Sequence, residues 1–412
     1  MNAFPPGSRA LVVGVHGSIG AMLARQLASS GFRVTGIDLA RADAAPANVT
    51  VLQADATRPD AALRQVLGET RILVLAVSQH VLTQALPQLL PHLPADALLV
   101  ETLSIKSPFA AWLADQPTTQ AVLGINPMFS GDLDPAGRPL AAVPYRDAPL
   151  ADAFIDLLRQ WRLDVVTLTP AQHDEAMAML QTVGHSAVLA FGQTLARSPL
   201  ALDALLRLAP PPFRVMLALL ARMTQNHPDV YWEIQADNPC SADARRRLLN
   251  ALATLDDGVA SDDHAGFHTA LTALKEDLIA DHPDYVDTSR RIFEFINQPP
   301  APDTLPAFRA AIDRIDDQLI DLLGQRQALI GQVAHFKKTS QTPVMQPNRV
   351  LEVVQRCKTR GQRWHLRGEL IEQLYRLIIE EACHIEYEHV GGPREPLLQR
   401  SAPAFQSAGV NE

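Results

Sequence analysis

Short apolar runs alternate with helical stretches over the first part of the chain. The runs occupy residues 9–15, 33–39, 50–55, 71–77, 97–102 and 121–126, and segments of helical character separate them. Short strands that alternate with helices are the pattern of a parallel sheet with crossover helices. The sequence therefore predicts an α/β domain over residues 1–169.

The pattern changes near Pro170. Residues 170–297 carry a series of helical segments without strand signals, which predicts an all-α domain. Prolines at 299, 300, 302 and 306 stop helix propagation, so residues 298–306 are predicted to be an extended linker. Residues 307–390 are again helical, and we expect the Gly, Pro and Ser-containing tail 391–412 to be disordered.

The first helix of residues 307–390 carries a heptad seam. Its apolar residues follow spacings of three and four, at Phe308, Ile312, Ile315, Leu319, Leu322, Leu329, Val333 and Phe336. Arg326 interrupts this seam, where an unpaired buried guanidinium would cost several kcal/mol. We therefore expect an anion to meet Arg326, with Lys337 on nearly the same face; alternatively, the arginine only fixes helix register.

Composition narrows the class of protein. A chain of 412 residues suggests about three domains, and a net charge of -9 argues against a nucleic-acid surface while leaving room for small anions. Cys240, Cys357 and Cys383 fit neither a disulfide framework nor a metal site. No apolar window reaches about 18 residues and no signal segment is visible, so we expect a cytoplasmic protein without membrane or metal partners.

A glycine-rich turn follows the first predicted strand. Gly14, Gly17 and Gly20 let the backbone approach a pyrophosphate, and the N–H groups around Ser18 and Ile19 open the next helix toward that charge. Asp38 ends the second strand, where its carboxylate can accept from a ribose hydroxyl and would repel a 2′-phosphate. These features predict a Rossmann-type site for NAD. Two alternatives remain: the nearby Arg41 leaves NADP possible as the cofactor, and the glycines could serve tight helix packing alone.

Residues 9–297 resemble the prephenate dehydrogenase family. The resemblance is carried by LVVGVHGSIG, LVLAVSQHV, ETLSIKSP, VLGINPMFSGD, QHDEAMAMLQTVGHS and FRVMLALLARMTQNHPDVY. It implies an enzyme that binds NAD on a Rossmann-type domain, forms a homodimer through its helical domain, and removes hydride and carbon dioxide from a cyclohexadienol to form an aromatic ring. By resemblance, Ser78 joins the cofactor site and Ser104 lies near the reacting end of the substrate.

The same resemblance places two further residues at the substrate. His185 corresponds to a substrate-contacting or supporting histidine, and Arg222 to the arginine that holds a substrate carboxylate. Arg214 lies eight residues earlier on the same predicted helix, about 80° around it, so both arginines can face one pocket. A dianionic substrate would offset their burial among apolar neighbours; alternatively, either arginine is solvated or pairs with a structural carboxylate.

Asn126 departs from the family pattern. The family has a histidine before Pro-Met-Phe, which accepts the proton of the substrate's C4 hydroxyl. An amide cannot act as a base near neutral pH, and losing a general base typically costs about 10²–10⁴ in rate. A neutral C4 amine can push hydride out without such a base, which favours 4-amino-4-deoxyprephenate as the substrate. Two alternatives remain: prephenate with His185 as the base, and a ligand-sensing regulator that has lost catalysis.

Residues 304–390 resemble the all-helical class of chorismate mutases. By resemblance, Arg326, Lys337 and Arg349 grip the two carboxylates and the ether oxygen of the substrate, and Arg309 reaches into the partner chain's pocket. Glu386 stands where a glutamine often contacts the ether oxygen; a protonated carboxyl there would donate to that oxygen, and activity would fall as the pH rises.

The residues expected at the C4 end of the mutase site also differ from the family pattern. Gln346 and Val350 stand where the family usually has acidic residues that contact the C4 hydroxyl, although Val350 has no explanation in amine recognition. The favoured hypothesis is a bifunctional 4-amino-4-deoxychorismate mutase and NAD-dependent 4-amino-4-deoxyprephenate dehydrogenase, which yields 4-aminophenylpyruvate in a p-aminophenylalanine pathway. The alternative is a chorismate mutase and prephenate dehydrogenase of tyrosine biosynthesis.

Overall fold

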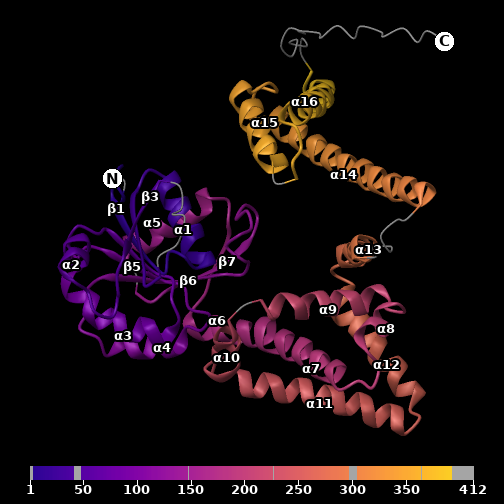
Figure 1. The fold of residues 1–412 in the computed structure, drawn as a ribbon, viewed down its shortest axis with the longest axis horizontal. Helices are drawn as coiled ribbons and strands as arrows, with labels where there is room; N and C mark the ends of the chain where they lie inside the picture. The colour runs from indigo at the N-terminus through magenta and orange to yellow at the C-terminus, as the bar shows by residue number, and fades with distance from the viewer. Residues whose placement is uncertain are drawn as a thin grey trace. The chain divides into compact units, whose positions relative to one another are not determined.

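The computed structural model describes residues 3–40, 48–146, 148–225, 227–296, 304–362 and 364–391. The chain falls into two compact units, Met1–Asn297 and Gln298–Glu412 (Figure 1). Arg41, most of the predicted linker and nearly all of the predicted tail lie outside the described residues. The expectations for the residues outside the described ranges therefore stay predictions. Leu305 and Pro306, at the end of the predicted linker 298–306, are helical instead, because a proline is tolerated in the first turn of a helix.

The first unit contains an eight-stranded sheet with the order β3-β2-β1-β4-β5-β6-β7-β8. The first six strands are parallel and coincide with the six predicted apolar runs: β1 (Arg9–Val13), β2 (Arg33–Asp38), β3 (Val49–Gln53), β4 (Ile72–Leu75), β5 (Leu98–Glu101) and β6 (Ala121–Pro127). The strand order reverses at β1, which pairs with β2 on one side and β4 on the other. Ligands of such sheets bind at this switch point, outside the carboxyl ends of the strands.

Two further strands were not predicted. β7 (Pro139–Pro144) runs antiparallel to β6, and β8 (Asp164–Thr167) runs parallel to β7. A parallel return would need a crossover of about a dozen or more residues, usually with a helix. The segment 128–138 has no helix, so the chain turns back directly and β7 pairs with β6 in the opposite direction.

Helices cover both faces of the sheet. One face packs against α1 (Ser18–Ser29) and α5 (Pro149–Gln160). The other face packs against α2 (Ala61–Gly68), α3 (Gln79–Leu89) and α4 (Ser107–Ala114); the short helix η1 (Leu90–His92) follows α3. Alternate residues of β1 enter the two cores, because strand side chains alternate in direction. Both faces are buried, which explains why the strands are continuous apolar runs.

Helices complete the first unit. They are α6 (Pro170–Met177), the π-helix η2 (Ala178–Val183), α7 (Gly184–Ala196), α8 (Leu202–Leu206), α9 (Pro211–Met223), α10 (Pro228–Ala236), α11 (Ser241–Ala260), α12 (His264–Leu274), the π-helix η3 (Lys275–Ile279) and α13 (Asp284–Ile296). Many of their large apolar side chains are exposed, including Leu249, Leu252 and Leu271. α6 starts at a capping box formed by Thr169 and Gln172, which fixes where this helical part begins.

The second unit consists of three helices, α14 (Leu305–Ser340), α15 (Pro347–Gln362) and α16 (Gly368–Val390), among its described residues. The prediction of one long first helix is confirmed, because α14 spans 36 residues. The heptad-seam residues Phe308, Ile315 and Leu322 are at least half exposed in the single chain. Of the helices described in either unit, none is long and apolar enough to cross a membrane.

Candidate active sites

The glycine turn after β1 has the shape that a dinucleotide site requires. Gly14 has a φ of +78°, and a Cβ at this position would overlap the carbonyl oxygen of Ala76. A Cβ on Gly20 would overlap the carbonyl of Gly14, so α1 crosses the turn closely. Gly17 is the N-cap of α1, and no side chain within the described residues caps that first turn. The N–H groups around Ser18 and Ile19 therefore open a helix that is free to meet an anion.

The other predicted cofactor residues gather at the same switch point. Asp38 is the last residue of β2, and its carboxylate accepts hydrogen bonds from the backbone N–H groups of His16 (3.2 Å) and Ala40 (3.3 Å). Ser78 is the N-cap of α3, directly after β4. The turn, the carboxylate and the cap thus follow β1, β2 and β4 in turn. This arrangement fits a dinucleotide whose pyrophosphate lies at α1 and whose ribose lies at Asp38.

A buried ion pair fixes the loop that carries Ser104. The Nζ of Lys106 donates to Oε1 of Glu101 (2.7 Å) and to the carbonyl of Ile125 (3.0 Å), and both charged side chains are fully buried. Tyr145 donates to the same Oε1 (2.7 Å). Burial lowers the pKa of Lys106, and Glu101 opposes that shift. The half-buried Ser104 lies between the two charged residues in the chain, and Lys106 ties this loop to Ile125 of β6.

Asp174 joins the helical part to this loop. Its Oδ1 accepts from the backbone N–H of Lys106 (2.8 Å) and its Oδ2 from that of Ser107 (2.7 Å), so a residue of α6 satisfies the first turn of α4. Its backbone carbonyl accepts from Asn238 (2.9 Å). Burial raises the pKa of Asp174, but the hydrogen bonds from His173, Ser107 and Lys106 more than offset it and leave the pKa below its usual value. Asp174 is therefore an ionised and fully engaged carboxylate.

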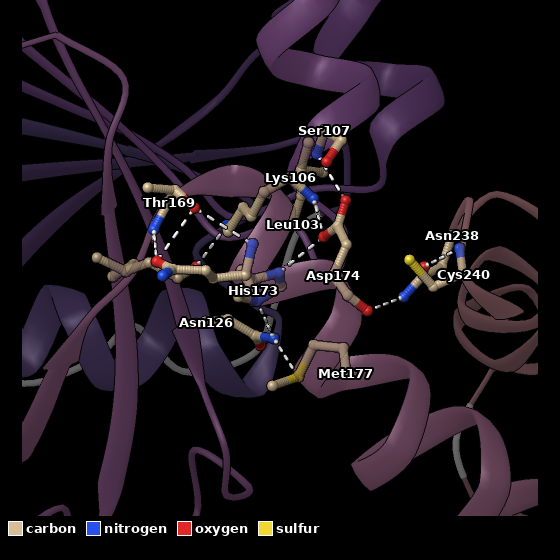
Figure 2. A network of polar contacts seen from close by, with 12 residues as sticks. Leu103, Lys106, Ser107, Asn126, Thr169, His173, Asp174, Met177, Asn238 and Cys240 are labelled. Carbon is tan, nitrogen blue, oxygen red and sulfur yellow. Dashed lines mark hydrogen bonds and ion pairs between the residues drawn. The ribbon is translucent and has the colours of Figure 1, made fainter. Parts of the chain in front are cut away.

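Asn126 contacts a histidine that sequence reasoning did not single out. Its Nδ2 lies 3.1 Å from Nε2 of His173 and 3.5 Å from Sδ of Met177. On the other side of the ring, Nδ1 of His173 lies 2.8 Å from Oδ1 of Asp174 (Figure 2). Asn126 is 4 % exposed and His173 is fully buried. Burial lowers the pKa of His173, and the bond to Asp174 opposes that shift without cancelling it. The lowered pKa favours a neutral imidazole at pH 7, and the amide of Asn126 covers its Nε2.

A signal for His173 was present in the sequence. His173, Met177, Gln181 and His185 follow one another at intervals of four. An α-helix advances about 40° beyond a full turn over four residues, and the wider turns of the π-helix η2 compensate for this drift. π-Helical turns are rare and occur mostly at functional sites, which agrees with the position of η2 beside Asn126.

Among the four residues His173, Met177, Gln181 and His185, two buried polar atoms have no hydrogen bond within the described part of the chain. They are Oε1 of Gln181 and Nδ1 of His185. The His185 ring packs edge-on against Tyr231 at 5.0 Å between centroids, and burial lowers its pKa. Orphaned buried polar atoms are costly unless a ligand or water meets them. This agrees with the predicted substrate role of His185, which stays a prediction.

The two arginines predicted to share one pocket have different surroundings. Arg222 on α9 is half-exposed, and its Nη2 lies 3.7 Å from Oδ1 of Asp132, in the loop that follows Asn126. Arg214 instead donates to the carbonyls of Leu206 (2.9 Å) and Ala209 (3.2 Å) after α8. These bonds use two of the five N–H donors of the Arg214 guanidinium. Arg222 is thus placed toward the Asn126 loop, while a substrate contact for Arg214 stays a prediction.

The second unit encloses a cavity of about 660 Å³, within the usual range of small-molecule sites. Five of the six predicted mutase residues line it: Arg326, Lys337, Gln346, Arg349 and Glu386. Val350 lines it as well, and Arg356, Tyr375 and Cys383 are lining residues that were not predicted. The sixth, Arg309, is exposed on α14 and does not line this cavity. Its predicted insertion into a partner chain stays a prediction.

The cations of the cavity are held in place by the helices around it. Lys337 donates to Oε2 of Glu386 (2.5 Å) and to the carbonyl of Val344 (2.9 Å). Nη1 of Arg326 donates to the carbonyl of Ile378 (3.2 Å). Arg349 forms a half-exposed ion pair with Glu352. Glu386 thus faces Lys337 as an ion-pair partner, a geometry different from the expected donation by a protonated carboxyl to a substrate oxygen, which stays untested.

The sheet, the glycine turn and the buried loop define a dinucleotide-binding dehydrogenase with a separate helical unit. Residues 169–273 match the family model "Prephenate dehydrogenase, dimerization domain", and residues 308–387 match "Chorismate mutase type II". The 4-amino-4-deoxyprephenate dehydrogenase of Streptomyces pristinaespiralis is 38% identical over 274 residues, which are 66% of this chain and 92% of that protein. The chain belongs to the prephenate dehydrogenase family and carries a C-terminal chorismate mutase domain. Both resemblances drawn from the sequence are confirmed.

Other relatives match parts of the chain. The T-protein of Enterobacter agglomerans is 28% identical over 228 residues, which are 54% of this chain and 55% of that protein. The 4-amino-4-deoxychorismate mutase of S. pristinaespiralis is 29% identical over 97 residues, 24% of this chain and 75% of that protein. The structure of prephenate dehydrogenase from A. aeolicus in complex with hydroxyphenyl propionate and NAD+ is 17% identical, with a TM-score of 0.54 over 66% of this chain and 96% of that chain, which shows the shared fold.

Proposed function

We propose that this bifunctional enzyme acts on C4-amino substrates. The mutase unit rearranges 4-amino-4-deoxychorismate, and the dehydrogenase unit converts the resulting 4-amino-4-deoxyprephenate to 4-aminophenylpyruvate and carbon dioxide. One observation carries the proposal: an amide stands where the family has its base, and the imidazole that contacts this amide has its Nε2 covered by it. The 38% identity to a protein named 4-amino-4-deoxyprephenate dehydrogenase supports the same reading.

The reaction balances without a protein base when the C4 nitrogen is a neutral amine. Gly14, Gly17, Gly20 and Asp38 would hold NAD, which would supply the acceptor for the hydride that leaves C4. The bond from the ring to its carboxylate breaks, carbon dioxide departs, and the electron pair of that bond enters the ring. The ring becomes aromatic and the nitrogen keeps both its protons. The nitrogen lone pair supplies the push toward hydride loss that an un-ionised hydroxyl supplies less well.

The protein's part is to hold and enclose the substrate. Arg222 is placed to pair with a carboxylate near the Asn126 loop, and the orphaned atoms of Gln181 and His185 offer two further polar contacts. Ser104 lies in the loop that the buried Glu101–Lys106 pair fixes, and it is proposed to contact the reacting end of the substrate. Positioning and the exclusion of water are sufficient tasks for a substrate that carries its own electron donor.

In the mutase unit, the same cavity residues serve an extended dianion. Arg326, Lys337 and Arg349 provide cations for two carboxylates and for the charge that develops on the ether oxygen as the C–O bond breaks. Gln346 and Val350 line the cavity without a carboxylate. A C4 group other than the hydroxyl of chorismate fits a change at these two positions, although Val350 has no explanation in amine recognition. The 29% identity to a 4-amino-4-deoxychorismate mutase supports this half of the proposal.

The second candidate is a chorismate mutase and prephenate dehydrogenase that serves tyrosine biosynthesis. His173 favours it, since a titratable imidazole lies within hydrogen-bond distance of Asn126. His185 favours it too, because its Nδ1 has no hydrogen bond among the residues that the structure describes. The similarity to the T-protein of E. agglomerans points the same way. This candidate requires His173 or His185 to accept the proton of a C4 hydroxyl.

We also propose that the chain acts as a homodimer. The matched family model is that of a dimerisation domain, and its helices expose large apolar residues such as Leu252 and Leu271. The exposed heptad seam of α14 suggests a second helix-to-helix interface, and the exposed Arg309 on that helix suits insertion into a partner's cavity.

The deciding experiment measures NADH formation with each substrate. Enzyme and NAD are mixed with 4-amino-4-deoxyprephenate or with prephenate, and absorbance gives kcat/KM for both. We expect the amino compound to be preferred by about 10²–10⁴, the usual effect of a general base in the reaction that lacks one. An equal or higher kcat/KM for prephenate would establish the second candidate, and NADH from neither substrate would leave only the ligand-sensing hypothesis.

A further inference from the structure

We propose that His173 is a positioning residue that fixes the orientation of the Asn126 amide, so that the dehydrogenase site presents a hydrogen-bond acceptor to the C4 substituent. The inference rests on the proposed function in one respect, because it takes Asn126 to face C4. Its first steps concern only contacts inside the protein, and they hold for either substrate.

Asp174 fixes the tautomer of His173. Two backbone N–H groups, from Lys106 and Ser107, hold the Asp174 carboxylate at 2.8 and 2.7 Å. A carboxylate held in this way only accepts hydrogen bonds. Nδ1 of His173, 2.8 Å from Oδ1 of Asp174, must therefore carry the imidazole proton. Nε2 is left with a bare lone pair.

The bare Nε2 in turn fixes Asn126. An acceptor at 3.1 Å requires the amide to direct Nδ2 toward it, and the sulfur of Met177 at 3.5 Å is a second, weak acceptor on the same side. The opposite orientation would set the Oδ1 lone pairs against Nε2 and leave a buried hydrogen bond unmade. The network thus decides which end of the amide faces His173.

The remaining end of the amide is an acceptor. Within the described residues, both side-chain hydrogen bonds of Asn126 are made by Nδ2. Oδ1 is left to accept from the substrate, and a C4 amine can donate one N–H to it while its lone pair stays free to push toward the ring. A C4 hydroxyl can donate to Oδ1 as well, but an amide oxygen cannot take its proton. The acceptor orientation is therefore sufficient for an amine and insufficient for an alcohol.

Protonation of His173 would reverse the arrangement. A proton on Nε2 makes it a donor, so Asn126 would turn Oδ1 toward it and present an N–H to the substrate amine. The charged groups around the ring are Asp174 beside it on α6, Lys106 at the start of α4 and Glu101 at the end of β5. Burial keeps the pKa of His173 below its usual 6.5 despite Asp174. The working orientation is thus present at neutral pH and lost as the pH falls through this lowered pKa.

Two substitutions separate positioning from packing. In His173→Gln, the amide can donate to Asp174 and accept from Asn126, but it does not titrate. We expect the wild type to lose kcat as the pH falls through the lowered pKa of His173. We expect His173→Gln to keep kcat within a few-fold of the wild type and to lack this acid limb. His173→Phe keeps a ring without an acceptor, and we expect kcat to fall about 10- to 100-fold, as when a hydrogen-bond partner that orients a functional group is removed. His92→Gln on η1, at the amino end of β5, is the matched control and should change neither quantity.

A spectroscopic measurement tests the tautomer without any substrate. The full chain is labelled with ¹⁵N-histidine, and the His173 signals are assigned by their loss in His173→Gln. At pH 7 we expect Nδ1 to show a protonated nitrogen and Nε2 an unprotonated one. A protonated Nε2, or a wild-type acid limb retained in His173→Gln, would overturn the inference. The expected tautomer together with a preference for prephenate would instead refute the proposed substrate and leave the positioning of Asn126 standing.

Discussion

At the residue scale, the proposed substrate preference depends on the amide of Asn126, which stands where a base is expected from the resemblance to the family. Asn126 is buried, and its partners are fixed by a chain of contacts that runs through His173 and Asp174 to the first turn of α4. Each member satisfies the next, which is the condition for keeping a polar network inside a protein. In the proposed reaction, the identity of Asn126 therefore changes the chemistry while the polar network around it stays satisfied.

Restoring the base at this position tests the argument. In Asn126→His, an imidazole replaces the amide beside the C4 substituent, so we expect kcat for prephenate to rise by about 10²–10⁴, the usual contribution of general base catalysis. Initial rates of NADH formation with prephenate and with its 4-amino analogue give the measurement. Asn126→Gln keeps the amide chemistry and is the matched control, for which no gain with prephenate is expected. A variant that binds prephenate and shows no gain would contradict the assignment of position 126.

The sequence predicted some of these residues and missed others for a physical reason. The glycine turn and Asp38 lie close together along the chain, and their spacing alone indicates the dinucleotide. His173 and Asn126 are 47 residues apart, and they meet only because α6 packs against the end of β6. Arg214 was predicted from its position on a helix face, but its surroundings include the end of α8, which the helix pattern does not reveal.

At the scale of elements, the loop between β5 and α4 depends on a fully buried ion pair. Glu101 and Lys106 meet in the core, and Gly124 on the neighbouring strand leaves the space for the carboxylate, since a Cβ there would overlap its Oε1. Burying two charges is compensated only when each finds all its partners. Glu101 has three, namely Lys106, Tyr145 and the backbone N–H of Leu103.

Removing the cation should destabilise the first unit strongly. Lys106→Met leaves Glu101 buried without its countercharge, and breaking a buried pair in this way costs about 3–5 kcal/mol in the free energy of unfolding. Urea unfolding, followed by a signal from the dehydrogenase unit, gives the measurement. Arg9→Met, which breaks the half-exposed pair with Glu69, is the matched control and should cost no more than about 1 kcal/mol. Equal losses in the two variants would show that burial does not set the importance of the pair.

Whether an element could be predicted from the sequence depends on how that element is stabilised. Six strands are apolar runs because helices bury both their faces, and α14 follows a heptad pattern over its length. β8 has an exposed outer position at the sheet edge and is only four residues long, so its run is weak in sequence. The π-helical turn η2 has no distinct residue pattern, because one additional residue in a helical turn changes the register and leaves the periodicity similar.

At the scale of the whole molecule, each activity has its own compact unit. The dinucleotide turn, Asn126 and Arg222 belong to Met1–Asn297, and the cavity lined by Arg326 belongs to Gln298–Glu412. Because the mutase product is the dehydrogenase substrate in the proposed reaction sequence, one chain carries two consecutive steps. The two predicted active sites have no residue in common, so we expect substitutions in one site to leave the activity of the other unchanged.

Paired arginine substitutions test this independence. Arg326→Ala removes a cation that the mutase transition state needs, and we expect mutase activity to fall about 10²–10³-fold while NADH formation from added dehydrogenase substrate is unchanged. Arg222→Ala should do the reverse, with a raised KM for the dehydrogenase substrate, because Arg222 is half-exposed and its loss leaves the core intact. Arg314→Ala, on the same helix as Arg326 but away from the cavity lining, is the control. Each assay supplies its own substrate, so one activity does not depend on the product of the other. A loss of both activities in either single variant would therefore mean that the sites communicate through the assembled protein. The description of two self-contained active sites would then be wrong.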